Sequence, residues 1–416
     1  MKSRRLIYPV LALALAAVAC NLPGLPPVVT SPPVTVPPVT ELPVTVPPVV
    51  TEPPIVVTEP PVSTALMPAG FIIGSIGDPV RLLFYDLASS LIGVVNAPSL
   101  QNAGIDDVFP VGGVSGGTLP AVVYYTYDGN NILINGGGVE SLLATVPQFY
   151  AMNGAPAQPI IAYGTADMTS GGLNTSLFVG APETVASSSP VLSYTDEPNG
   201  AIFPLHILMD GSTPIGIWFT KQMYGIGGDL VFAPTTGLFY LNLTSGVVSE
   251  FTLPSVTIYS PGVSPSANWM AYTDQGIGIG TGRLNIQQTT AGENHAFPLL
   301  GDSDRGAGGG VFSPDELHVA WMEGHGWTMA EVPDFRSTVR FGSTSGTTLA
   351  DYPASMFDAA AGFSVAYARP VGWLDNETVL VQATGTNWIQ NSVLRLDLSG
   401  NITFIGSGGF TGFTYP

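Results

Sequence analysis

The sequence predicts an all-β fold assembled from a repeated unit. Glycine (50 residues) and proline (38) are abundant in this chain of 416 residues, while charged residues make up only 10%. That composition suits short strands joined by tight turns, and it disfavours long amphipathic helices, which need faces of Glu and Lys. Beyond about Ala69, short apolar runs recur, and each is followed by Gly, Asn, Asp, Ser or Pro.

The apolar runs recur with a regular period. Seven of them start 38 to 60 residues apart, with a mean spacing of about 50. A period of about 40–50 residues built from four short strands is typical of β-propeller blades. We therefore predict one β-propeller over residues 69–416, with seven blades, and with six or eight as the alternatives. The runs are Phe71–Ile73, Ala121–Tyr125, Pro159–Tyr163, Ile215–Phe219, Trp269–Thr273, His318–Met322 and Thr378–Val381.

A second recurring segment predicts the outer half of a blade. Three further apolar runs resemble one another, and each is followed by turn residues such as Ser, Thr and Gly. Val247–Phe251 follows one of them and is expected to be the outer strand of its blade. The last residues, Phe410–Tyr415, are expected to close the ring beside the region after Pro68. The three runs are Arg81–Leu87, Gly237–Leu243 and Val393–Leu398.

Three segments carry a sharper motif. They read FSPDELHVAW (312–321), VSPSANWMAYT (263–273) and GWLDNETVLV (372–381). Their pattern resembles the SPDG repeat of TolB-like β-propellers, although Ser266 and Glu316 stand where Asp and Gly are usual and the first three units lack the motif. Pro and Asp would shape the turn from the inner strand to the second strand. The resemblance implies binding of protein or glycan at the propeller faces, without one fixed activity.

The N-terminus predicts a bacterial lipoprotein signal peptide over residues 1–19. Three basic residues precede the apolar run Leu6–Ala19, whose small final residues lead directly into Cys20, the only cysteine of the chain. Cleavage there would leave Cys20 to be acylated, for example with palmitate, and several acyl chains give stable anchoring. An ordinary secretory signal with a chance cysteine is the alternative. We expect the protein to face the periplasm or the cell surface.

Residues 20–68 are expected to be a disordered spacer that follows the lipidated cysteine. The segment Asn21–Val62 is of low complexity and contains 14 prolines among valines and threonines. Proline fixes φ near the polyproline II value and lacks the donor that a helix or sheet needs. The spacer should therefore be semi-rigid and hold the propeller away from the membrane.

The charge balance narrows the possible partners. The chain has 11 Lys and Arg against 30 Asp and Glu. Three of the bases belong to the signal peptide, so the remainder carries 8 against 30, a net charge of −22. Such a protein repels phosphate backbones, which argues against nucleic acid as a partner. The expected partners are the lipid membrane, through the anchor, and an envelope protein or glycan.

Catalytic motifs are weak in this sequence. Gly113–Gly117 matches the GxSxG pattern of a hydrolase nucleophile elbow, which needs Ser115 on a sharp turn between a strand and a helix. Thr118–Pro120 follows directly, so no helix can begin there. We therefore expect no catalytic residue at this position.

Metal-binding motifs are equally weak, and we expect no cofactor. The histidines show no zinc-site spacing, although Glu323 and His325 share one short segment. Asp302–Gly306 begins like a calcium loop but lacks the later glutamate, so we expect no calcium site there. Ca²⁺ is the secondary hypothesis, because the surplus of acidic residues could supply its ligands. The four histidines are His206, His295, His318 and His325.

Three aromatic residues are candidates for a ligand-binding face: Tyr224, Trp327 and Trp388. Trp327 follows Gly326, Trp388 follows Asn387, and glycine comes directly after Tyr224. Aromatic rings at such turns can form a platform for sugars or peptides. The alternative is that the rings pack between blades.

Taken together, these patterns predict a membrane-anchored extracytoplasmic lipoprotein whose propeller is a non-catalytic module for binding protein or glycan. One alternative is an enzyme, a hydrolase or lyase with an acidic site in the propeller funnel. The other is a structural component of the envelope or surface. A funnel lined by Gly, Ser and Val would argue against the enzyme, because acid–base chemistry needs converging titratable side chains.

Overall fold

The computed structural model describes residues 66–75, 80–100, 108–111, 119–126, 129–169, 171–222, 234–251, 253, 257–274, 282–290, 292–301, 305–326 and 335–416. Cys20, the predicted signal peptide and the spacer up to residue 65 lie outside these ranges. Within the described residues we find no helix with the length and apolar character of a membrane span.

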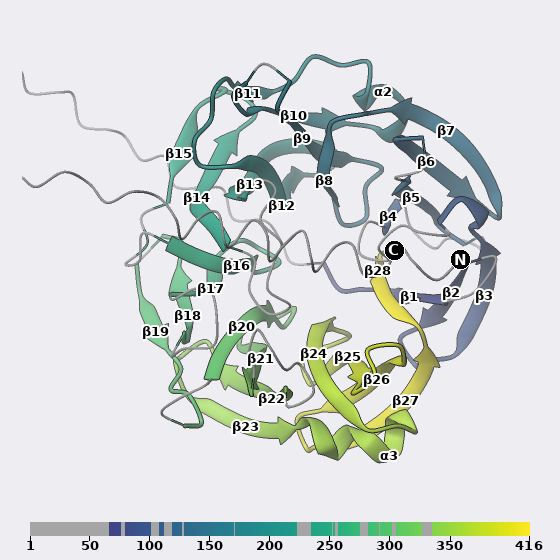
Figure 1. Ribbon diagram of the computed structural model, residues 1–416, viewed down its shortest axis with the longest axis vertical. Helices are drawn as coiled ribbons and strands as arrows, with labels where there is room; N and C mark the ends of the chain where they lie inside the picture. Colours follow the sequence, from purple (N-terminus) through teal and green to yellow (C-terminus); the bar gives the residue numbers. More distant parts are fainter. Residues whose placement is uncertain are drawn as a thin grey trace, which may run out of the picture. The chain divides into compact units, whose positions relative to one another are not determined.

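The described chain forms a β-propeller of seven four-stranded blades, arranged in a ring with one strand of each blade nearest the centre (Figure 1). This confirms the predicted fold class and the count of seven. From inner to outer strand, blade 1 is β28 (Gly409–Thr414), β1 (Gly70–Ser75), β2 (Arg81–Asp86) and β3 (Leu91–Asn96); blade 2 is β4 (Val108–Val111), β5 (Ala121–Thr126), β6 (Asn131–Gly136) and β7 (Val139–Thr145); blade 3 is β8 (Phe149–Gly154), β9 (Ile161–Asp167), β10 (Asn174–Gly180) and β11 (Leu192–Tyr194).

The remaining four blades follow the same order along the chain. A direct pairing of β14 with β16 joins blades 4 and 5 into one sheet. Blade 4 is β12 (Ala201–Asp210), β13 (Thr213–Gln222), β14 (Pro234–Asn242) and β15 (Val248–Glu250); blade 5 is β16 (Thr257–Val263), β17 (Trp269–Thr273), β18 (Leu284–Gln288) and β19 (Asn294–Ala296); blade 6 is β20 (Arg305–Phe312), β21 (His318–His325), β22 (Arg336–Ser343) and β23 (Thr348–Pro353); blade 7 is β24 (Val365–Trp373), β25 (Thr378–Gly385), β26 (Asn391–Asp397) and β27 (Ile402–Ser407).

In the part of the chain that the structure describes, helices are short and lie in connections between strands. Each spans a single turn. They are the 3₁₀ helices η2 (Pro98–Leu100) and η5 (Ala354–Phe357) and the α-helices α2 (Pro182–Val185) and α3 (Asp358–Ala361).

The recurring apolar run of the sequence is the second strand of each blade. The seven predicted runs correspond to β1, β5, β9, β13, β17, β21 and β25. The run within this strand is apolar because neighbouring blades cover both of its faces; every residue of β25 is buried, including Thr378, Gln382 and Thr384. The second family of runs falls on the third strands β2, β14 and β26, and Val247–Phe251 contains the outer strand β15, as predicted.

The two ends of the propeller meet in blade 1. The C-terminal strand β28 pairs antiparallel with β1, with Phe71 opposite Phe413 and Gly70 opposite Thr414. The N–H of Ala69 also donates to the carbonyl of Thr414 at 2.7 Å. The predicted closing strand is therefore confirmed, and blade 1 depends on residues from both ends of the domain.

The motif turns of blades 5, 6 and 7 are bonded to one another. The side-chain amide oxygen of Asn376 in blade 7 accepts from the N–H of Asp315 in blade 6 at 3.0 Å. The carboxylate of Glu316 in turn accepts from the N–H of Ser266 in blade 5 at 2.7 Å and from the Asn268 amide at 3.1 Å. Glu316 has a left-handed φ of 57°, which explains why glycine is usual there. Its side chain adds a contact between blades that glycine cannot make.

Candidate functional site: the central channel

The innermost strands surround two adjoining cavities. The larger, about 410 Å³, lies among β16, β20, β24 and β28, and the smaller, about 280 Å³, lies among β12, β16, β20 and the C-terminal Tyr415. Gly262, Gly310 and Val311 line both cavities. They are therefore two parts of one central channel, which we call the arginine segment and the histidine segment after Arg369 and His206.

Glycines of β20 shape the wall of the arginine segment. Gly308, Gly309 and Gly310 all line it, and the pairing of β20 with β21 shifts register between Gly308 and Val311. Gly309 has φ of 68°, a left-handed conformation that favours glycine. A Cβ on Gly262 would lie 2.5 Å from the carbonyl oxygen of Gly310, so a side chain there would collide with the neighbouring backbone. The glycines let the inner strands of blades 5 and 6 approach while the channel stays open.

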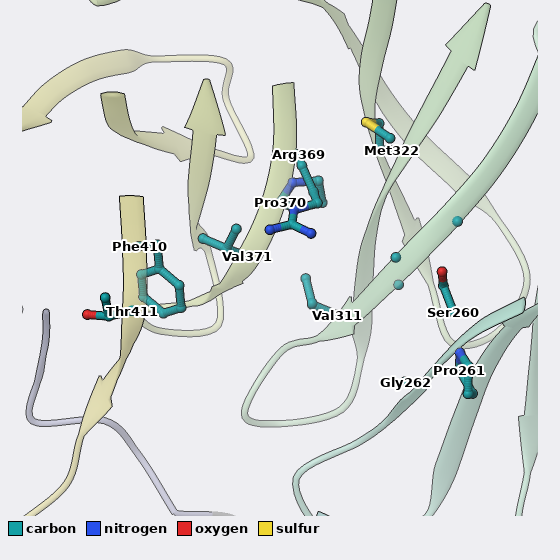
Figure 2. A pocket seen from close by; sticks show the side chains of 13 residues that line it. Ser260, Pro261, Gly262, Val311, Met322, Arg369, Pro370, Val371, Phe410 and Thr411 are labelled. Carbon is teal, nitrogen blue, oxygen red and sulfur yellow. The ribbon is translucent and has the colours of Figure 1, made fainter. Parts of the chain in front are cut away.

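Arg369 is the one charged side chain among the described residues that line the arginine segment. Figure 2 shows its guanidinium extending from β24 into the space bounded by Val311, Val371 and Phe410. A guanidinium stays protonated at any pH that a folded protein tolerates and offers only donors. The segment therefore presents a fixed positive charge within walls of small and apolar side chains.

The histidine segment is uncharged at neutral pH. Burial lowers the pKa of His206 to about 4, although the charge of Glu316 acts in the opposite direction. Burial also raises the pKa of the Tyr415 phenol to about 12. Apolar side chains of Leu66, Met209 and Phe312 complete the wall. This end of the channel offers one imidazole and one phenol as hydrogen-bonding groups.

The predicted aromatic candidates are only partly described. Trp388 is half-buried in the turn between β25 and β26 with φ of 59°, and its ring lies 6.3 Å from that of Phe335 and 6.2 Å from that of Tyr367. These rings form a small cluster on blades 6 and 7. A ligand-binding role for Trp388 stays a prediction. Tyr224 and Trp327, like Ser115, lie outside the described residues.

Three of the histidines that were weighed as metal ligands lie in different parts of the fold. His206 lines the channel, His295 is 2.9 Å from Glu293 in an exposed pair, and the His318 ring stacks on Trp373. In the part of the chain that the structure describes, no group of three His, Cys, Asp or Glu side chains could hold a metal ion. Residues 302–304 of the calcium-like loop fall outside that part.

A buried charge network crosses blade 6 and uses Glu323. Its carboxylate is fully buried and lies 3.0 Å from Arg305 and 2.7 Å from Arg340. Arg340 also donates to Asp351 at 2.6 Å and to the carbonyl of Pro298 at 2.6 Å. Each of the four strands contributes one charged residue, and both carboxylate oxygens of Glu323 are engaged in ion pairs within the blade. Sequence reasoning missed this network because its members are 11 to 18 residues apart and meet only through strand pairing.

The only lysine beyond the signal peptide is buried as well. Lys221 lies 2.7 Å from Glu197 and above the ring of Tyr194, 4.0 Å from its centroid. Its charge is therefore neutralised inside the protein and contributes little to the surface.

Two comparisons by sequence give no match for this chain. No protein-family model matches it, and a search of curated proteins finds no match. Similar solved structures include TolB from Acinetobacter baumannii (12% identity, 82% of this chain and 80% of TolB, TM-score 0.39). They also include a Mycobacterium tuberculosis puromycin-hydrolyzing peptidase (12% identity, 83% of this chain and 54% of that chain, TM-score 0.49). This chain thus spans about half the length of the peptidase. At these identities and scores the similarities say nothing about activity.

Proposed function

We propose that this protein is a lipoprotein anchored through Cys20, and that its propeller binds an envelope protein or glycan in the central channel without transforming it. The observation that supports binding is the make-up of the channel wall. Glycine, serine, threonine, proline and valine, together with Met322 and Phe410, line the arginine segment around a single guanidinium, and the histidine segment is neutral at pH 7. Small side chains leave backbone amides accessible to a ligand, and Arg369 places a positive charge in the wall that favours an acidic or carbonyl-rich ligand.

Catalysis would require other side chains in the wall of the channel. A hydrolase or lyase requires an acid and a base with matched pKa values on either side of the scissile bond. Among the described channel residues, the titratable side chains besides Arg369 are His206 and Tyr415, and their pKa values of about 4 and about 12 lie far from neutrality. The side chains of the described channel wall therefore support binding without turnover, and they do not support the alternative of an enzyme with an acidic site in the funnel.

The anchor is tested by replacing Cys20 with alanine. The variant should be released from the membrane fraction, while a matched Ser3→Ala variant should stay with the membrane, because the acyl chains attach to the cysteine sulfur and to the amino group that its cleavage exposes. Intact-mass spectrometry of the wild type should show a chain that begins at Cys20 and carries added acyl mass. Retention of Cys20→Ala in the membrane would contradict the anchor.

A further inference from the structure

A second cavity of about 340 Å³ lies between blades 2 and 3, away from the central channel. It is bounded on one side by β9 and β10 of blade 3 and on the other by Thr145, at the end of β7, and by residues 146–148, which connect the two blades. We call it the blade 2–3 cleft.

The register of β9 and β10 arranges three unlike side-chain pairs on the wall of this cleft. Tyr163 pairs with Phe178, Thr165 with Ser176, and Asp167 with Asn174. Successive pairs are two residues apart, so the row extends over about 13 Å. Residues on the opposite face of these two strands, such as Ala162 and Leu177, pack toward blade 4.

The aromatic end of the row belongs to the core between the blades. The rings of Tyr163 and Phe178 are stacked at 4.8 Å and 9°, and Phe149 continues the stack toward Tyr125, 3.8 Å away. Further along the row the apolar packing stops, and Thr165, Ser176, Asp167 and Asn174 are all only half-buried. The cavity exists because polar side chains replace the apolar ones that fill the space beside Tyr163.

The polar groups are held in place by the protein. Oδ1 of Asp167 accepts from the N–H and the hydroxyl of Thr169 at 2.9 and 2.7 Å. The Ser176 hydroxyl lies 2.8 Å from that of Ser193, and Thr165 Oγ1 accepts from the N–H of Ser176 at 3.2 Å. Pre-organised groups lose little entropy when a ligand binds. The wall thus offers fixed hydroxyl, amide and carboxylate groups in a line.

This chemistry matches a sugar better than a peptide or an anion. The Asp167 carboxylate can accept from two neighbouring hydroxyls, and Phe178, half-buried on the cleft wall, can contact the apolar C–H groups of a pyranose ring. Asp167 is the one charged side chain among the described lining residues, in a chain with a net charge of −19. Acidic ligands are therefore repelled. We propose that the blade 2–3 cleft is a second binding site, separate from the channel, for a neutral glycan.

The test is titration of the full chain with saccharides, followed by saturation-transfer NMR. The probes are the methyl glycosides of glucose, galactose, mannose and N-acetylglucosamine, their disaccharides, and methyl glucuronide as the acidic comparator. At least one neutral probe should bind saturably. Thr165→Val with Ser176→Ala should weaken that binding at least about tenfold, because the lost hydroxyls leave ligand groups unpaired. Ser141→Ala, a hydroxyl deletion on an exposed part of β7, should leave binding unchanged.

A charge-removal variant separates a binding role from a structural one. Asp167→Asn keeps an acceptor for Thr169 but removes the charge, so it should raise the affinity for glucuronide relative to the neutral sugar. Asp210→Asn, at the exposed end of β12, is its control and should change neither affinity. Three results would overturn the proposal: no neutral probe binds, the double variant binds as tightly as the wild type, or the wild type binds glucuronide equally well. If the double variant fails to fold, Asp167→Asn decides alone.

Discussion

Replacing Glu323 with leucine should lower the free energy of unfolding by about 3–5 kcal/mol. The carboxylate is completely buried and accepts from two guanidinium groups and from the N–H of Leu300 at 3.0 Å. Without it, Arg340, whose side chain is 3% exposed, would stay buried beside another cation. Urea unfolding followed by tryptophan fluorescence measures the loss.

A double variant distinguishes an ion pair from simple packing. Glu323→Leu with Arg340→Leu removes both members of the buried pair, so it should be more stable than Glu323→Leu alone, in which the buried Arg340 is left with the half-exposed Asp351 as its carboxylate partner. Glu250→Leu removes an exposed carboxylate from β15 and should change stability by less than about 0.5 kcal/mol. If the losses of stability in Glu323→Leu and in Arg340→Leu simply add up in the double variant, the two side chains are not coupled and the ion pair does not stabilise the fold.

Removing residues 408–416 should abolish cooperative folding of the propeller. The truncation deletes β28 and so leaves β1 without its inner partner. Phe71, Ile72 and Ile73 of β1 are fully buried, and their backbone groups would lose hydrogen bonds in a place that water does not reach in the intact fold. Near-ultraviolet circular dichroism and limited proteolysis should both report loss of fixed tertiary packing.

The matched control is a shorter truncation. Deleting only Tyr415 and Pro416 leaves β28 intact, and the chain should keep its near-ultraviolet spectrum. A peptide of residues 408–416 added to the longer truncation should restore part of that spectrum, because the strand supplies the missing pairing. If the variant without residues 408–416 unfolds at the same urea concentration as the wild type, blade 1 closes without β28 and the prediction is wrong.

The fold could be predicted because the apolar run of the second strand recurs in every blade. The second strand of each blade is covered on both sides, so it must be apolar in every blade, and runs such as His318–Met322 and Thr378–Val381 stand out at the blade period. Closure was also predictable, since Phe410–Tyr415 had no other blade to join. The departure of Glu316 from the motif was visible, whereas its bonds to Ser266 and Asn268 required the spatial order of the blades.

The site was much less predictable than the fold. The channel wall comes from strands of different blades, and a glycine such as Gly309 carries no chemical signature in sequence. The polar wall of the blade 2–3 cleft did leave a trace, because Thr165 and Asp167 alternate with small residues directly after Tyr163. The same alternation occurs in any half-exposed strand. The polar wall can be recognised only from the pairing of β9 with Asn174 and Ser176 of β10.

The most direct test of binding without turnover uses the central channel. The full chain, solubilised in detergent, is titrated with soluble fragments of the cell's own envelope, and the retained component is weighed by mass spectrometry over time. Val371→Trp fills the arginine segment, and Val247→Trp, on an exposed turn, is its control. The wild type and the control should retain one component saturably and with unchanged mass, and Val371→Trp should not. A product that accumulates with time, or equal retention by Val371→Trp, would contradict a non-catalytic channel site.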